Sequence, residues 1–322
     1  MTVANVEETA FKEQSSPTKP SSESALEDQY YKVCHEMVLN LTQDEKEHAA
    51  RTSYKYFMLS ISQTGSKPSE AEQLKCAMAM AKRHLIAENG DQECALKKMK
   101  NTIQYRKDIN VDGIRRAFYE KEGPDEEKNK EYQHIRNNLE HQMSTGIVHV
   151  RGYDTRKAAN YIAFPRLKIS DDPEWYIKAN IYTLERALAC SERASEGEVE
   201  KVCCFFDYSG YKSKHSPPVT LIRDLFFCLR DHYPERMKHV FIVDAPVIFR
   251  SFWYLIRPFL DPVTKSKVKF VAGEVQKQEV FAGIINKDQA MNFMYPDGGK
   301  TKEMNVMEFL YDIPYDHAFD ED

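Results

Sequence analysis

The spacing of apolar side chains changes partway along the chain. In its first third the spacing is helical, since Ala95, Met99 and Ile103 recur every four residues. Later, short and wholly apolar runs such as Val202–Phe206 and Val240–Val243 alternate with helical stretches. Runs that are apolar on both faces are typical of strands in a parallel sheet covered by helices. The second half of the chain is therefore expected to be α/β.

Expected strands and helices alternate through this second half. The strands are expected at residues 147–150, 161–164, 202–206, 240–243 and 268–271. The helices are expected at Pro173–Ala194, at a stretch that carries Leu221, Leu225 and Leu229, and at roughly Val247–Ile256. Each crossover between parallel strands should be right-handed.

Composition divides the chain into four parts. Residues 1–28 are rich in Ser, Thr, Glu and Lys, which predicts a disordered tail. The charged segment KEGPDEEKNK at 121–130 contains Gly–Pro and marks a boundary. It separates a helical N-terminal subdomain (29–120) from a second domain (121–275), and a C-terminal extension (276–322) follows.

Charge and cysteine content narrow the class of protein. The 322 residues include 45 basic and 50 acidic ones, a net charge of -5 that argues against nucleic acid as a partner. The chain has seven cysteines, an odd number, and no Cys-x-x-Cys motif. This favours reduced thiols in the cytoplasm. The N-terminus shows no signal-peptide pattern, and the most apolar stretch, Val240–Leu260, is broken by charges and prolines and does not fit a membrane span.

Motifs that would indicate an enzyme are not found. Neither G-x-G-x-x-G nor G-x-S-x-G occurs, and Gly299-Lys300-Thr301 lacks the earlier glycine of a phosphate-binding loop. His134 and His141 could share a helix face, but their charged surroundings favour a solvated face over a metal site. Asp207 and Asp244 follow strands and could serve acid–base chemistry, although a capping or turn role is favoured. We expect no catalysis, no metal and no cofactor.

The helix expected at Val247–Ile256 is apolar around nearly its whole circumference. Taken alone, this pattern favours a helix buried in the core. The alternative is a helix with one face toward a lipid-sized cavity and the other toward a membrane.

Three neighbouring segments resemble the CRAL-TRIO lipid-binding family, in its branch of phosphatidylinositol/phosphatidylcholine transfer proteins. They are Tyr233–Arg236, Val240–Pro246, and Arg257–Thr264 together with Lys267. Weaker likeness at Tyr105–Asp108, Val202–Gly210 and Gly298–Lys300 extends the resemblance over roughly residues 75–300.

The resemblance implies a fold and a function. It implies a helical N-terminal CRAL-TRIO subdomain and a lipid-binding domain, whose mixed, mainly parallel sheet and helices enclose an apolar lipid pocket. A mobile helix gates that pocket in the family and matches Val247–Leu260, which reverses the preference for a core helix. The gate and pocket residues implied are Phe249, Phe252, Trp253, Ile256 and Phe259.

The implied protein is soluble and cytoplasmic and associates transiently with membranes. It would hold one phospholipid, phosphatidylinositol, and exchange it at the membrane surface as a monomer. The family's headgroup residues match Glu235 and Lys267, and Thr264 could add a hydroxyl contact. The alternative for Glu235 and Lys267 is an ordinary surface ion pair.

Three departures from the family pattern leave alternatives open. The basic turn of the family is replaced by Ile86–Asp91, and the hairpin at Lys157–Asn160 also differs. Positions that hold a choline headgroup match Val202, Cys204 and Leu229, so phosphatidylcholine binding is not expected. The same fold could instead bind a sterol, a tocopherol or a retinoid. A third possibility is a non-transferring interaction module whose acidic end, Asp316–Asp322, recruits partners.

Overall fold

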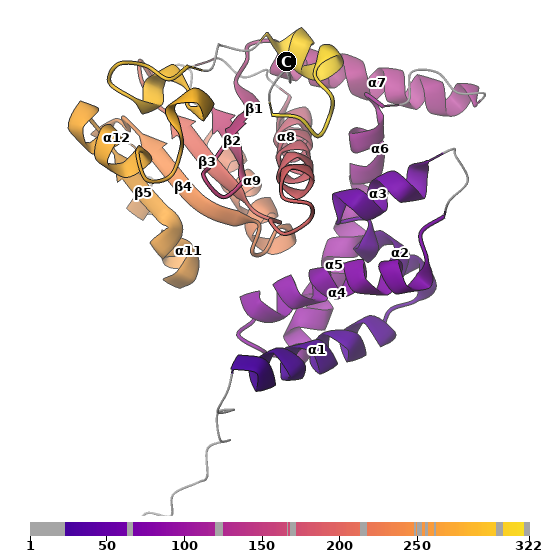
Figure 1. Ribbon diagram of the computed structural model, residues 1–322. Coiled ribbons are helices and arrows are strands. Elements are labelled where there is room, and N and C mark those ends of the chain that lie inside the picture. The colour runs from indigo at the N-terminus through magenta and orange to yellow at the C-terminus, as the bar shows by residue number, and fades with distance from the viewer. Residues whose placement is uncertain are drawn as a thin grey trace, which may run out of the picture.

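A computed structural model describes residues 23–62, 67–119, 125–165, 167, 172–212, 218–247, 249, 253–254, 257–260, 262–300 and 305–318. A cluster of N-terminal helices and a sheet flanked by helices pack together, as Figure 1 shows. The 22-residue helix α8 (Pro173–Ala194) joins the two parts, because it contacts α3, α6 and α7 as well as β1, β2 and β3.

The N-terminal helices are α1 (Glu23–Leu39), α2 (Gln43–Ala50), α3 (Tyr54–Ile61), α4 (Glu70–Ala87), α5 (Gln92–Asp108) and α6 (Val111–Arg116). Side chains fix where they begin: Thr42 and Ser69 form capping boxes, and Asp91 accepts a hydrogen bond from the backbone N of Cys94 at 2.9 Å. Ala95, Met99 and Ile103 are buried in a core shared with α1 and α4. Helix α1 begins at Glu23, inside the range expected to be a tail, and residues 1–22 lie outside the described residues.

Helix α7 (Glu126–Met143) leads into a five-stranded sheet of order β1-β2-β3-β4-β5. The strands are β1 (Val148–Tyr153), β2 (Ala159–Ala163), β3 (Val202–Asp207), β4 (Met237–Val243) and β5 (Val268–Val271). β1 pairs antiparallel with β2, and the other neighbours are parallel. The mixed, mainly parallel sheet behind a helical N-terminal part confirms the expected α/β fold class.

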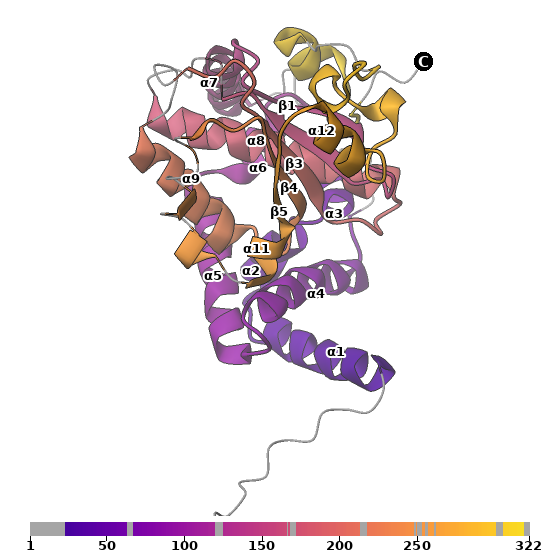
Figure 2. The same ribbon diagram turned by 90° about the vertical axis from the view of Figure 1, so that its left-hand side faces the viewer.

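Helices cover both faces of the sheet, and Figure 2 shows α9 (Val219–His232) and α12 (Glu274–Phe281) on opposite sides. Alternate residues of β3 serve the two cores. Cys204 packs in the cluster that includes α8 and α9, whereas Phe205 packs with Phe241 and Phe281 on the α12 side. Turns η3 (Lys287–Gln289) and η4 (Asn292–Met294) extend this second core.

The C-terminal segment returns to α8, where Arg186 makes several hydrogen bonds to it. Arg186, 1% exposed, donates hydrogen bonds to the carbonyls of Ile313 at 2.9 Å, Pro314 at 3.2 Å and Tyr315 at 3.1 Å. This segment includes the single turn η5 (Glu308–Asp312). Among the described helices we find none long and apolar enough to cross a bilayer.

Candidate functional site

Glu235 lies in the turn between α9 and β4 and contacts two lysines. Its two carboxylate oxygens are each 3.3 Å from Nζ of Lys267, the last residue of α11 (Pro262–Lys267). Its Oε2 also accepts a hydrogen bond from Nζ of Lys201 at 2.9 Å. The structure therefore brings the predicted pair together and adds Lys201, which the sequence analysis did not single out.

The two lysines keep the Glu235 carboxylate charged. Partial burial favours the neutral acid, but the hydrogen bonds and charges of Lys201 and Lys267 outweigh it and lower the pKa of Glu235 below its ordinary value. The side chains of Glu235 and Lys267 are each 16% exposed, and that of Lys201 is 41% exposed. The site is thus a half-buried charged cluster that solvent can reach.

The turn that carries Glu235 is fixed on both sides. Glu235 has a left-handed backbone with φ 56°, an uncommon conformation for a residue other than glycine. The preceding Tyr233 donates its hydroxyl to Glu185 at 2.9 Å, and the following Arg236 donates to the carbonyls of Thr52 at 2.9 Å and Glu200 at 3.1 Å. These buried anchors hold the backbone so that the Glu235 carboxylate meets the lysines.

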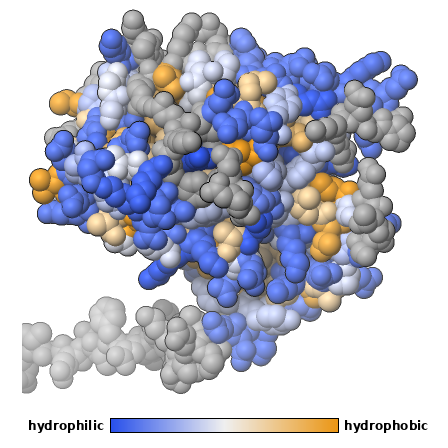
Figure 3. Space-filling model, turned by 45° about the horizontal axis from the view of Figure 1, so that its top comes forward, coloured by the Kyte–Doolittle hydropathy of each residue, from blue (hydrophilic) through white to orange (hydrophobic). Residues whose placement is uncertain are grey.

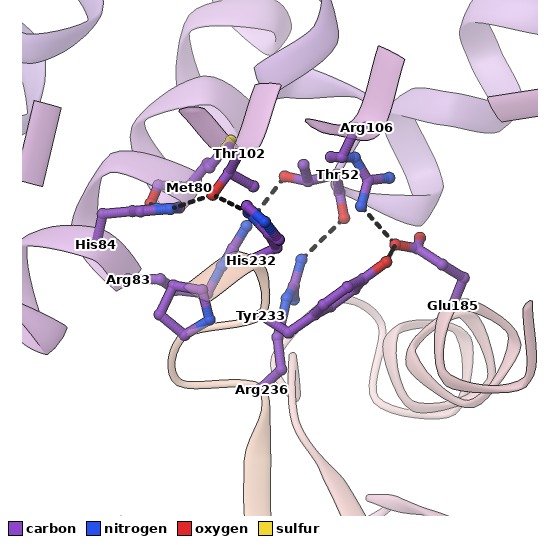
Figure 4. Close-up of a pocket in the computed structure, with 11 residues that line it drawn as sticks. Thr52, Met80, Arg83, His84, Thr102, Arg106, Glu185, His232, Tyr233 and Arg236 are labelled. Atoms are coloured by element: carbon purple, nitrogen blue, oxygen red, sulfur yellow. Dashed lines mark hydrogen bonds and ion pairs between the residues drawn. The ribbon is translucent and has the colours of Figure 1, made fainter. Parts of the chain in front are cut away.

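A polar junction beside this turn connects the N-terminal helices to the sheet (Figure 4). It surrounds a cavity of about 10 Å³ and is lined by Thr52, Met80, Arg83, His84, Thr102, Arg106, Glu185, His232, Tyr233, Pro234 and Arg236. Glu185 pairs with Arg106, and Arg83 pairs with Glu200. The volume suits about one water molecule, so the junction is a structural contact rather than a ligand pocket.

An apolar cavity lies on the α8 and α9 side of the sheet. Its volume is about 40 Å³, and it is lined by Tyr161, Asn180, Leu184, Cys204, Phe206, Leu225, Leu229, Tyr233, Arg236 and Met237. A few water molecules would fill it, at ~10–15 Å³ each, so a lipid needs the surrounding elements to move apart. Cys204 and Leu229 face the cavity and Val202 is wholly buried, so none of these three positions offers the polar contact expected for choline.

The gate segment, Val247–Leu260, is only partly described. Phe249 packs against Tyr208 with ring centroids 4.8 Å apart, and Trp253 packs edge-on against Phe270 at 5.5 Å. Val247 is 79% exposed and Tyr254 is 68% exposed, which a helix buried on all sides would not show. Phe252 and Ile256 lie outside the described residues, and of Phe259 only the backbone is described, in η2 (Arg257–Phe259).

The other polar candidates from the sequence analysis are Thr264, Asp207 and Asp244. Thr264 lies within α11, one turn before Lys267. Asp207 accepts a hydrogen bond from the backbone N of Ser209 at 2.9 Å, and Asp244 accepts one from the Ser209 hydroxyl at 3.0 Å, contacts that suit the turn role. Among the described residues no group of three or more His, Cys, Asp or Glu side chains could hold a metal ion.

One signal in the sequence could have identified Lys201. Lys201 directly precedes β3, Glu235 lies two residues before β4, and Lys267 directly precedes β5. The amino ends of neighbouring parallel strands meet at one edge of a sheet, and Val202 pairs with Met237 in the register. Charged residues just before consecutive parallel strands therefore converge, which spacing within a single segment does not reveal.

Comparison with known proteins agrees with this fold. Residues 143–294 match the family model described as the CRAL/TRIO domain. The SEC14 cytosolic factor of Kluyveromyces lactis is 25% identical over 298 residues, which cover 90% of this chain and 91% of that protein. The phosphatidylinositol transfer protein PDR17 of Saccharomyces cerevisiae is 27% identical over 131 residues, or 39% of this chain and 36% of that protein.

A solved structure shares the fold. The crystal structure of Sfh5 superposes with a TM-score of 0.56 at 13% identity, covering 90% of this chain and 92% of that one, which shows a shared fold. The resemblance to the CRAL-TRIO family, in its phosphatidylinositol/phosphatidylcholine transfer branch, is thereby confirmed. The chain spans between 33% and 40% of the length of three of its curated relatives.

Proposed function

We propose that this protein binds a single phospholipid, phosphatidylinositol, in a gated apolar pocket and exchanges it at membrane surfaces. The observation that carries the proposal is the half-buried contact between Glu235 and Lys267, 3.3 Å apart, on the turn that also lines the apolar cavity through Tyr233 and Arg236. A lysine can neutralise a lipid phosphate, and a carboxylate can accept hydrogen bonds from inositol hydroxyls. The name of one relative, the phosphatidylinositol transfer protein PDR17, supports the same function.

Exchange requires the gate segment to open. The cavity of about 40 Å³ cannot hold acyl chains, whose exposure to water costs ~0.8 kcal/mol per CH₂. Opening would separate the Phe249 and Trp253 contacts with Tyr208 and Phe270 and enlarge the cavity. A bilayer lowers the cost of this step, because it accepts the apolar groups that opening exposes.

Exposed apolar side chains near the gate suit a membrane surface. Val247 and Tyr254 on the gate, Val263 on α11 and Val275 on α12 are all more than half exposed. On the face shown in Figure 3 most of the surface is hydrophilic, and apolar side chains form small separate groups. Such small groups fit transient contact with a membrane better than permanent insertion.

The proposed role needs no chemical step. Binding and exchange use burial, charge and gate movement, and need neither a nucleophile nor a cofactor. We place the protein in the cytoplasm as a soluble protein. We expect a monomer, because the gate must face a bilayer. All seven cysteines are free thiols, as expected in a reducing compartment.

Native mass spectrometry of the purified protein, followed by identification of released lipid, tests the proposal. Stoichiometric phosphatidylinositol is the expected result. A transfer assay with labelled phosphatidylinositol should then show that Lys267→Ala weakens binding while the melting temperature stays unchanged. Unchanged transfer by this variant would overturn the headgroup assignment. A protein that contains no lipid and takes up none would indicate an interaction module.

A second candidate ligand class is favoured by the lining of the cavity. Tyr161 donates its hydroxyl to Asn180 Oδ1 at 2.5 Å, a polar pair in surroundings that are otherwise mostly apolar. Such a pair could hold the single hydroxyl of a sterol, a tocopherol or a retinoid. Recovery of such a molecule by lipid extraction would keep the fold and replace phosphatidylinositol as the ligand.

A further inference from the structure

Lys201, Glu235 and Lys267 form a three-residue charge cluster at the amino ends of β3, β4 and β5. Nζ of Lys201 is 2.9 Å from Glu235 Oε2, closer than Nζ of Lys267, which lies 3.3 Å from both oxygens. Charge-assisted N–H···O bonds are shortest near 2.7–2.9 Å, so Lys201 makes the stronger bond to the carboxylate. The longer contact leaves Lys267 more weakly held.

The cluster carries an excess of one positive charge. Two ammonium groups face one carboxylate, and the lowered pKa of Glu235 keeps that carboxylate ionised at neutral pH. Each ammonium has three N–H donors, and the single Lys201–Glu235 bond uses one of them. One further negative charge would balance the cluster and accept the remaining donors.

We propose, on the basis of the proposed function, that Lys201 is a second phosphate-binding cation of the headgroup site. The cluster then selects phospholipids with a net negative headgroup over zwitterionic ones. A phosphatidylinositol headgroup carries one negative charge on its phosphodiester, which matches the excess. A phosphatidylcholine headgroup is neutral overall, and its quaternary ammonium would meet two lysines. Glu235 holds the two ammonium groups near each other, and they repel less when a phosphate bridges them.

Lys201 is suited to this role by its exposure. At 41% its side chain is far more accessible than those of Glu235 and Lys267 at 16%. It can therefore meet a headgroup as it enters from the membrane, whereas Lys267 must be reached inside the cluster. An exposed ion pair contributes little to stability, so removal of Lys201 should leave the fold intact.

The test compares three variants of the full chain: Lys201→Met, Lys267→Met, and the control Lys269→Met, which changes an exposed lysine of β5. Uptake is measured from vesicles that carry labelled phosphatidylinositol and from vesicles that carry labelled phosphatidylcholine. We expect Lys201→Met to weaken phosphatidylinositol binding about tenfold, the loss of one hydrogen bond to a charged group. Its phosphatidylcholine uptake should rise above the low level of the wild type, because one of the two ammonium groups that repel choline is gone. Its melting temperature should match the wild type, and Lys269→Met should change neither lipid.

Two outcomes would overturn the inference. If Lys201→Met binds phosphatidylinositol as the wild type does while Lys267→Met does not, Lys201 is only an ion-pair partner. If phosphatidylcholine uptake by Lys201→Met stays as low as that of the wild type, the cluster does not discriminate headgroup charge. Wild-type protein that takes up neither phospholipid would instead contradict the proposed function itself, which separates the two failures.

Discussion

Arg106 on α5 and Glu185 on α8 form an ion pair in the interior, with Arg106 Nη1 2.5 Å from Glu185 Oε1. The side chains are 6% and 3% exposed. Tyr233 donates its hydroxyl to the same oxygen, and Arg115 approaches the other oxygen at 3.4 Å. One carboxylate thus links the N-terminal helices, α8 and the turn that carries Glu235.

Breaking this pair from one side should destabilise the protein strongly. Glu185→Gln leaves Arg106 without its carboxylate partner and leaves Arg115 with Asp112 at 3.8 Å, and a buried charge that loses its partner costs about 3–5 kcal/mol. The free energy of unfolding, from urea titration followed by circular dichroism, should fall by that amount. The double variant Arg106→Met with Glu185→Leu should recover part of the loss, because both charges are then gone. Equal stability of Glu185→Gln and wild type would contradict the role of this pair.

Stability should fall as pH drops from about 6.5 to 4. Burial is the largest cause that lowers the pKa of His84 and of His149 to about 4. In the unfolded chain both histidines bind a proton near pH 6.5. Between pH 6.5 and pH 4 the unfolded chain therefore binds more protons than the folded chain, and the free energy of unfolding falls. Each histidine should contribute ~3 kcal/mol of destabilisation at pH 4.

Thermal melts at half-unit pH steps test this window. His84 contacts the Met80 carbonyl at 3.0 Å and the Thr102 hydroxyl at 3.2 Å, so His84→Gln keeps a side chain that can hydrogen-bond without titrating. Its pH dependence should be weaker than that of the wild type by the share of one histidine. The exposed His141 provides the control, since His141→Gln should leave the slope unchanged. An unchanged slope in His84→Gln would show that its protonation is not linked to unfolding.

Much of the fold follows from local sequence pattern. Helix α8 has the expected bounds, and β3 ends one residue later than expected. These elements depend on caps and apolar runs that lie within one segment. The antiparallel pairing of β1 with β2 depends on contacts between segments, and the apolar runs alone did not specify it.

The candidate site was only partly predictable for the same reason. Glu235 and Lys267 were inferred from family resemblance, and their contact depends on β4 lying beside β5. Lys201 joins them only through the pairing of β3 with β4. The gate prediction for Phe249 and Trp253 rested on the family resemblance, whereas their aromatic partner Phe270 comes from β5.

The contacts of Arg186 should hold the C-terminal segment against α8. Its guanidinium donates to the Phe309, Ile313 and Tyr315 carbonyls, and it lies 3.9 Å from the centroid of the Phe309 ring. A lysine carries its donors on a single nitrogen, so it cannot span these carbonyls as the planar guanidinium does. Arg186→Lys should therefore make the segment cleavable by limited proteolysis and lower the melting temperature. Arg230→Lys, at an exposed pair with Asp231, is the matched control. Equal protease resistance would show that Phe309 and Tyr315 anchor the segment without Arg186.

Asp244 and Lys277 should control how readily the gate segment moves. Asp244 directly follows β4 and precedes the gate segment, and its backbone is left-handed with φ 49°. Its carboxylate pairs with Lys277 of α12 at 2.5 Å. It also accepts hydrogen bonds from the Ser209 hydroxyl and from the backbone N of Gly273. Asn tolerates this backbone, its oxygen can accept the bond from Gly273, and its amide nitrogen can donate to the Ser209 hydroxyl, but it removes the charge that Lys277 neutralises.

We expect Asp244→Asn to speed lipid exchange several-fold while the melting temperature changes little, because the pair is partly exposed to solvent and the asparagine still makes hydrogen bonds there. Lys277→Met should show the same acceleration, and the double variant should be no faster than either single one, since both remove the same interaction. Exchange is measured as the transfer rate of labelled lipid between two vesicle populations. Slower exchange in Asp244→Asn would mean that the ion pair supports the open form instead, and additive effects in the double variant would mean that the two residues act separately.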